Sequence, residues 1–189
     1  MASGSHHSSV PEWARTPTGQ PVDPAAASCT ILSCGATSHA AGWSRELTEL
    51  GIEHRIIALR PRDAAEVQRI MTAELRRAVV GWRLMLTGPL AEVLHARALA
   101  LQAGLLDAEI IVGTTEVDRI PVSCAHCATT TLTRLPSSTR PRARAIRLVT
   151  CAGCAESLVV QDHLSPLRGG FLGVTHAPES RLEPAGEPR

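Results

Sequence analysis

Cys124-Ala125-His126-Cys127 and Cys151-Ala152-Gly153-Cys154 are two matched Cys-x-x-Cys pairs, and 23 residues separate them. A tight turn of this kind presents both its sulfurs to one side, and a tetrahedral metal ion needs four such donors about 2.3 Å away. The spacing therefore predicts a four-cysteine metal site on two facing β-hairpins. The residues between the pairs are numerous enough to run out and back as a hairpin.

The spacing leaves the identity of the metal open, because structural zinc and a rubredoxin-like iron that passes single electrons both use four thiolates. Rubredoxin-like sites usually lie among aromatic side chains. The module that contains the cysteine pairs, residues 121–176, has only one aromatic residue, Phe171. Zinc is therefore the first expectation and mononuclear iron the alternative. We expect His126, inside the first pair, to be an exposed histidine.

Composition restricts the remaining possibilities. The 189 residues can hold one medium domain and a small module. The 19 basic residues are all arginine and face 18 acidic ones, so the near-neutral charge argues against a nucleic-acid partner. No apolar run approaches the ~20 residues of a membrane span, and no signal pattern begins the chain. We expect a cytoplasmic protein without a membrane partner, whose thiols are reduced or bind metal.

The chain divides into four predicted parts. Residues 1–27 and the tail, 177–189, are rich in small residues and proline and are predicted to be disordered. Residues 28–120 alternate between short apolar strands and amphipathic helices, which predicts a three-layer α/β domain with a parallel sheet. Residues 121–176 are predicted to form a small all-β module whose core is too thin to be stable without its ion.

The expected strands of the α/β domain are 30–34, 52–59, 83–87 and 109–112. Its first two helices have apolar positions at helical spacing, predicted to face the sheet: Trp43, Leu47 and Leu50, then Val67, Ile70, Met71, Leu75 and Val79. In the β module, strand-like runs are expected at 146–150, 157–160 and 171–175.

One turn and two further cysteines lie around the first strand. Gly35-Ala36-Thr37-Ser38 connects this strand to the first helix, where backbone N–H groups and hydroxyls can hold an anion. An ordinary strand–helix turn is the alternative. Cys29 and Cys34 flank the strand, too far apart for a disulfide with each other if the strand is extended, and we expect both to be packed as small apolar groups.

Arginines crowd the segment between the cysteine pairs: Arg134, Arg140, Arg142, Arg144 and Arg147. Such a segment can lie on a nucleic-acid backbone or against an acidic protein, and a solvated loop is the alternative. No base-stacking aromatic accompanies the arginines. The chain also lacks a G-x-S-x-G, an H-E-x-x-H and a Walker loop, so it does not have the pattern of a stand-alone hydrolase.

The second half of the chain resembles a known family in several features together. After the two cysteine pairs come Leu158, Val160, His163, Ser165 and Phe171-Leu172-Gly173. This pattern, about 50 residues long, resembles the C-terminal module of the DmmA-like family, the small (gamma) subunit of bacterial dimethylamine monooxygenase. The resemblance implies a role for His163 and Ser165, either beside the metal ligands or at a subunit interface.

The first half looks like the nicotinamide-binding half of ferredoxin reductases. Thr87-Gly88-Pro89 stands where those reductases carry a similar Cys-Gly-Pro, and Arg60 ends the second strand much as theirs does. The first turn departs from their multi-glycine run. On this resemblance Gly35, Thr37 and Gly88 are the candidate cofactor-binding residues, although the domain can equally be a scaffold that has lost its ligand.

The resemblance implies an accessory or electron-relay subunit of a heteromeric monooxygenase. That enzyme would use NAD(P)H and dioxygen to remove a methyl group from a small secondary amine such as dimethylamine. Haem would belong to a catalytic oxygenase subunit, and flavin and an iron–sulfur cluster to a reductase subunit. Two other functions remain open: a zinc-ribbon protein that binds nucleic acid through the arginine-rich segment, and a stand-alone rubredoxin-type electron carrier.

Overall fold

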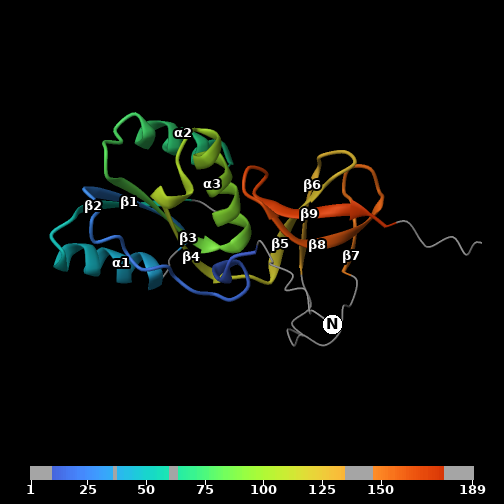
Figure 1. Ribbon diagram of the computed structural model, residues 1–189, viewed down its shortest axis with the longest axis horizontal. Helices are drawn as coiled ribbons and strands as arrows, with labels where there is room; N and C mark the ends of the chain where they lie inside the picture. Colours follow the sequence, from blue (N-terminus) through green and yellow to red (C-terminus); the bar gives the residue numbers. More distant parts are fainter. Residues whose placement is uncertain (1–9, 36–37, 60–63, 135–146, 177–189) are drawn as a thin grey trace, which may run out of the picture.

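The computed structural model describes residues 10–35, 38–59, 64–134 and 147–176, which form two β-sheets in succession (Figure 1). The first sheet has four parallel strands in the order β2-β1-β3-β4. Its strands are β1 (Ser28–Cys34), β2 (Glu53–Leu59), β3 (Trp82–Pro89) and β4 (Ile110–Glu116). Its helices are α1 (Ser38–Glu49), α2 (Ala64–Leu75) and α3 (Leu90–Gln102), and a short 3-10 turn, η2 (Asp107–Glu109), precedes β4.

Helices cover both faces of this sheet, which confirms the predicted arrangement of a parallel sheet between two helical layers (Figure 1). Successive residues of a strand point to opposite faces. Ile31 of β1 packs in one apolar cluster with Leu47 of α1. Its neighbour Leu32 packs in the other cluster with Met71 of α2 and Leu94 of α3.

Two residues expected on the inner helical faces are exposed instead. Leu50 is 47% exposed and Val79 is 63% exposed. The physical reason is the length of the helices: α1 ends at Glu49 and α2 at Leu75, so neither residue belongs to the helix that was expected to bury it. The other predicted inner positions are buried or pack against the core.

The prediction of disorder is wrong for residues 10–27, which pack along the edge strand β4. A 3-10 turn, η1 (Glu12–Ala14), buries Trp13. The Thr114 hydroxyl donates to the Trp13 carbonyl at 2.6 Å, and Gly19 pairs with Gly113 in an antiparallel bridge. The guanidinium of the buried Arg97 stacks over the Trp13 ring, 5.8 Å from its centroid. This segment pairs with the outer edge of β4, whose N–H and C=O groups would otherwise lack partners within the sheet.

The second sheet has five strands in the order β6-β5-β9-β8-β7. Its strands are β5 (Arg119–Cys124), β6 (Thr130–Arg134), β7 (Leu148–Thr150), β8 (Ser157–Ser165) and β9 (Gly170–Thr175). Two antiparallel hairpins, β5/β6 and β7/β8, lie on either side of β9. β9 runs antiparallel to β8 and parallel to β5.

The residues between the cysteine pairs do not pair with each other as a hairpin in the described part of the chain. β6 pairs with β5 and β7 pairs with β8, so these two strands occupy opposite edges of the sheet. This outcome corrects the expected out-and-back excursion. The reason is that each strand finds its partner across its own cysteine turn, which is the shorter connection. Residues 135–146 lie outside the described residues.

The second sheet packs against α3 of the first. Ile120 and Phe171 share an apolar cluster with Leu94 of α3. Gly169, at the turn between β8 and β9, lies so close to the helix that an added Cβ would be 2.7 Å from the Leu94 carbonyl oxygen. The Gln102 side chain donates to the Leu167 carbonyl at 2.7 Å. The small sheet therefore has apolar support from the helix in addition to any ion.

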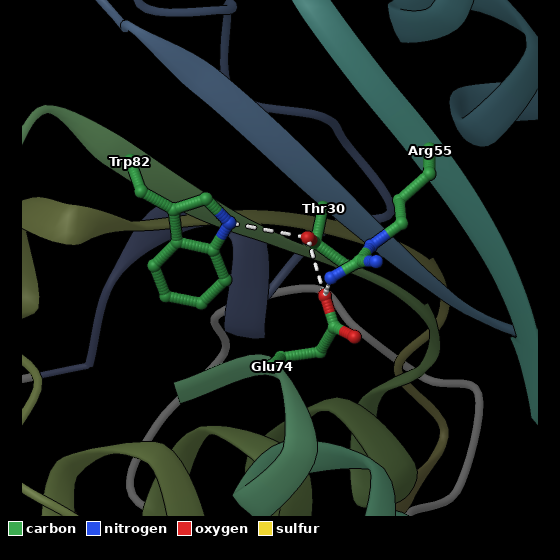
Figure 2. A network of polar contacts seen from close by, with 4 residues as sticks. All are labelled: Thr30, Arg55, Glu74 and Trp82. Carbon is green, nitrogen blue, oxygen red and sulfur yellow. Dashed lines mark hydrogen bonds and ion pairs between the residues drawn. The ribbon is translucent and has the colours of Figure 1, made fainter. Parts of the chain in front are cut away.

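A buried polar network links three strands and one helix of the first sheet (Figure 2). The indole N–H of Trp82 donates to the Thr30 hydroxyl at 3.1 Å, and this hydroxyl donates to Glu74 at 2.8 Å. Arg55 completes the network with an ion pair to the same carboxylate. Glu74 is only 4% exposed, and the network satisfies a carboxylate that would be costly to bury alone.

Replacing Thr30 with valine tests this network. Thr30→Val preserves the shape of the side chain but leaves the Trp82 indole and the Glu74 carboxylate each without one partner. We expect the free energy of unfolding in urea to fall by about 1–3 kcal/mol. Thr48→Val is the matched control, because the exposed Thr48 hydroxyl donates to the Ser44 carbonyl of its own helix, and its effect should stay within about 0.5 kcal/mol.

Candidate metal centre

The four cysteines of the two pairs converge on one point. Their sulfur atoms all lie within 4.8 Å of one another. The Cys124 and Cys154 sulfurs are 3.8 Å apart and the Cys127 and Cys151 sulfurs are 3.5 Å apart. A tetrahedron with metal–sulfur distances of about 2.3 Å has edges of about 3.8 Å. The donor set and the spacing therefore fit a tetrahedral metal ion bound by four thiolates.

The two turns that carry the cysteines have the same backbone hydrogen bonds. Cys124 N–H donates to the carbonyl of Thr129 at 3.0 Å, and Cys151 N–H donates to that of Glu156 at 2.8 Å. Ala128 and Ala155, which follow the second cysteine of each pair, return a bond to the carbonyl of the first cysteine at 3.0 Å. Each turn closes a hairpin, β5/β6 or β7/β8. The prediction of two cysteine turns on facing hairpins is confirmed.

Hydrogen bonds favour the thiolate form at three of the four cysteines, and at two of them the pKa is lowered overall. The hydroxyl and the backbone N–H of Thr129 lower the pKa of Cys127 to about 6. Backbone N–H groups of Cys154 and Gly153 lower the pKa of Cys151. The backbone N–H of Glu156 also favours the Cys154 thiolate, but burial and the adjoining Cys151 and Cys127 sulfurs outweigh it and raise its pKa to about 12. Two of the four ligands are therefore shifted toward the thiolate form that a metal ion binds, and metal binding at Cys154 displaces a proton.

The centre lies close to the protein surface on one side. Cys124 and Cys151 are buried, whereas Cys127 and Cys154, the second cysteine of each pair, are half-buried. Small or exposed residues surround the outer pair, including Ala125, His126 and Ala152. As expected, His126 points to solvent rather than replacing a thiolate.

Comparison with known proteins agrees with this site. The family described as "Dimethylamine monooxygenase subunit DmmA-like, C-terminal domain" matches residues 121–174, which contain all four cysteines. The chain is also 34% identical over 174 residues to the heme-dependent oxidative N-demethylase delta subunit of Ectopseudomonas mendocina (strain ymp). That alignment covers 92% of this chain and 91% of the relative. The chain belongs to the DmmA-like family. No solved structure gives a significant match.

The family resemblance drawn from the cysteine pairs and the residues that follow them is thereby confirmed, although the relative is named a delta rather than a gamma subunit. In the described part of this DmmA-like chain, no helix has both the length and the apolar character needed to cross a bilayer.

Sequence reasoning missed the residues that join the two turns of the DmmA-like centre. Ala152 N–H donates to the Thr131 hydroxyl at 2.9 Å. A Cβ at Gly153 would collide with Thr129 and lie 3.1 Å from the Cys127 sulfur, which explains why the second turn has glycine where the first has His126. The run of threonines after the first pair was the available signal for these contacts.

Ala128 and Ala155 both adopt a left-handed backbone conformation with φ of 60°. This region is strained for any residue with a Cβ and is the usual place for glycine. We expect Ala128→Gly and Ala155→Gly each to raise the free energy of unfolding by about 0.5–1 kcal/mol, the relief of strain being partly offset by the greater entropy of unfolded glycine. Urea unfolding of the metal-loaded protein measures this effect. Ala125→Gly, in the first turn but without a positive φ, is the control and should not stabilise the protein.

His163 and Ser165 lie in β8, away from the four sulfurs in strand register. Cys124 pairs with Gly173, whereas Ser165 pairs with Gly170, the first residue of β9 and three residues before Gly173. His163 is exposed and Ser165 is half-buried. This end of β8 adjoins the turn that contacts α3. A role for these two residues at an interface therefore stays a prediction, as does a role beside the ligands.

The candidate cofactor residues lie at the carboxyl end of the first sheet, where ligands of parallel sheets bind. Gly35 follows β1 with φ of 88°, and no described atom beyond its chain neighbours lies within 4 Å of an added Cβ. Gly88 has φ of 148°, and a Cβ there would lie 2.7 Å from the Cys34 Cβ. Close packing against Cys34 therefore explains glycine at position 88 without any cofactor. Thr37 and Arg60 lie outside the described residues.

The remaining cysteines are buried apart from the centre. Cys29 and Cys34 belong to the two different apolar clusters on either face of the sheet, and burial raises the pKa of each thiol to about 11. The expectation of two packed thiols is confirmed. Of the arginines between the pairs, Arg134 forms an ion pair with Asp118 at 3.2 Å and Arg147 is exposed. Arg140, Arg142 and Arg144 lie outside the described residues.

Proposed function

We propose that this chain is an accessory subunit of a heteromeric, NAD(P)H- and dioxygen-dependent monooxygenase that oxidatively N-demethylates a small secondary amine of the dimethylamine type. The observation that carries the proposal is similarity along nearly the whole chain to the delta subunit of a heme-dependent oxidative N-demethylase. In this proposal the haem belongs to a catalytic oxygenase subunit, and the flavin and iron–sulfur cluster belong to a reductase subunit. The assembly is cytoplasmic.

The role proposed for this chain's own residues is to hold the second sheet in shape for contact with those partners. Cys124, Cys127, Cys151 and Cys154 would bind one zinc ion, which supplies a fixed cross-link and no open coordination position. The ion would connect the hairpins β5/β6 and β7/β8, whose only common neighbour among the described strands is β9. His163 and Ser165 are proposed for the partner interface.

An electron relay is the second candidate, and the exposure of the centre favours it. Cys127 and Cys154 are half-buried, so a mononuclear iron held by these ligands would lie close to a docked partner. The chemistry that iron supplies there is acceptance and release of one electron. The chain's part would be to bring the outer sulfurs near the reductase subunit and then the oxygenase subunit.

Metal analysis separates the two candidates. The full chain, purified without chelators, is examined by plasma mass spectrometry and visible absorption. We expect one zinc per chain and no colour. One iron per chain, with thiolate-to-metal bands that bleach on reduction, would replace the structural role with the relay. A metal-free, fully folded protein would overturn both.

Nucleotide binding by the first sheet is a separate part of the proposal. Its open carboxyl end at Gly35 is where a nicotinamide cofactor would lie, with Thr37 as a further candidate contact. Equilibrium dialysis of NADH and NADPH against the full chain tests it. Absence of binding up to millimolar nucleotide would identify the domain as a scaffold, and would leave the metal site and the subunit role untouched.

A further inference from the structure

We propose that residues 76–80, between α2 and β3, form a docking turn that inserts into an apolar recess bordered by acidic side chains on a sister subunit of the demethylase. The inference rests on the proposed function, because the partner is another subunit of that assembly. The turn reads Arg76-Arg77-Ala78-Val79-Val80, and all five residues are exposed. Val79 is 63% exposed and Val80 is 99% exposed.

Single apolar side chains on a surface are common, but this turn combines an apolar tip with a positively charged base. Among the described residues, no ion pair involves Arg76 or Arg77. In the sequence, both arginines stand within four residues of the exposed valines. Arginine beside apolar side chains is a frequent composition of protein interfaces. Complementary charge requires carboxylates around the recess, which identifies the chemistry of the partner surface.

The buried network described above fixes both ends of the turn. Glu74 immediately precedes the segment 75–81 and Trp82 immediately follows it, and the single hydroxyl of Thr30 bonds to both side chains (Figure 2). A third tie comes from Ala27, whose N–H donates to the Gly81 carbonyl at 2.9 Å. A turn that is already ordered before binding loses little conformational entropy on association. The valines are therefore presented on a rigid support.

The position of the turn separates it from the other candidate sites. It precedes β3 and so lies at the amino end of the parallel strands, whereas ligands of such sheets bind at the carboxyl end. In Figure 1 the α2–β3 connection lies on the side of the first sheet away from the second sheet, which carries the four cysteines. A subunit bound at the turn therefore leaves the metal centre accessible to a different partner.

The test compares two charge-introducing variants of the full chain. Val80→Asp places a carboxylate at the tip, against the acidic border that the proposal requires. Leu106→Asp is the matched control, because Leu106 is 66% exposed in a different connection and stands at the N-cap of η2, where aspartate is favoured. Each variant is co-expressed with the other demethylase subunits of its own organism, and the complex is captured through a tag on this chain.

We expect Val80→Asp to weaken capture at least tenfold, because the new carboxylate would face the acidic border of the recess, while Leu106→Asp assembles like the wild type. Metal content and melting temperature of both variants should equal those of the wild type, which excludes misfolding. Arg76→Glu with Arg77→Glu should also weaken capture, and the wild-type affinity should fall with salt. Equal capture of Val80→Asp and wild type would overturn the docking turn alone. Failure of the wild type to assemble would overturn the proposed function, and the docking turn with it.

Discussion

Cys151→Ser is expected to abolish stoichiometric metal binding, reducing the metal content of the purified chain from one ion to near zero. A hydroxyl replaces one of four thiolates, and the remaining three cannot close the tetrahedral shell that the sulfur positions fit. Because metal binding and folding are coupled in small modules of this kind, the loss should also lower the melting temperature by roughly 10 °C or more. Metal analysis and thermal unfolding followed by circular dichroism measure the two effects.

Cys29→Ala is the matched control for this experiment. Cys29 is a buried cysteine in the first sheet, and it packs in the cluster under α1 rather than near the four sulfurs. Its loss removes a small apolar contact but no ligand, so the metal content should stay at one. A Cys151→Ser protein that kept both its metal and its melting temperature would contradict the four-thiolate centre.

Gly88→Ala is expected to destabilise the chain by about 2–4 kcal/mol, even if the first sheet binds no nucleotide. The added methyl group would meet the Cβ of Cys34 at 2.7 Å and its carbonyl oxygen at 2.9 Å, inside a sheet that cannot move apart locally. The φ of 148° at this position adds backbone strain. The free energy of unfolding in urea, measured in the absence of nucleotide, gives the effect.

Gly35→Ala is the control that separates the cost of close packing from the cost of a positive φ. Gly35 shares a positive φ, 88°, but an added Cβ there meets open space among the described residues. The expected loss is only the left-handed strain of about 1 kcal/mol. If both variants cost the same, close packing would not be the reason for glycine at position 88, and its place in a cofactor site would become the better explanation.

The sequence was sufficient for those elements in which local pattern and tertiary environment agree. The run from Thr30 to Cys34 contains no charged residue and is mostly apolar, and it forms a central strand that is buried on both faces. The N-terminal segment shows the opposite case. Trp13 is buried through contacts with Thr114 and Arg97, which lie far along the chain, and neither periodicity nor composition near Trp13 indicates them. The lone tryptophan in a proline-rich stretch was the available signal.

In the metal centre, the ligands were predictable because four thiolates on two tight turns have few alternative uses. The residues that hold the ligands in place were harder to predict from the sequence. The bond that Ala152 N–H donates to the Thr131 hydroxyl depends on how the two hairpins face each other, and a spacing rule contains no such information. The left-handed backbone conformation of Ala128 and Ala155 could not be predicted either, because the usual sequence signal for it is glycine and not alanine.

The strand order of the second sheet also has a consequence for how the chain folds during its synthesis on the ribosome. β9 is the last strand to be synthesised, yet it lies between the two hairpins and supplies their only shared backbone pairing among the described strands. All four cysteines leave the exit tunnel before it. During that interval a metal ion bound by the nascent chain would be the principal link between the two hairpins. It would keep β5 and β8 in positions that allow β9 to pair between them. Depletion of metal during translation should therefore harm the yield of folded protein more than chelation of the finished chain.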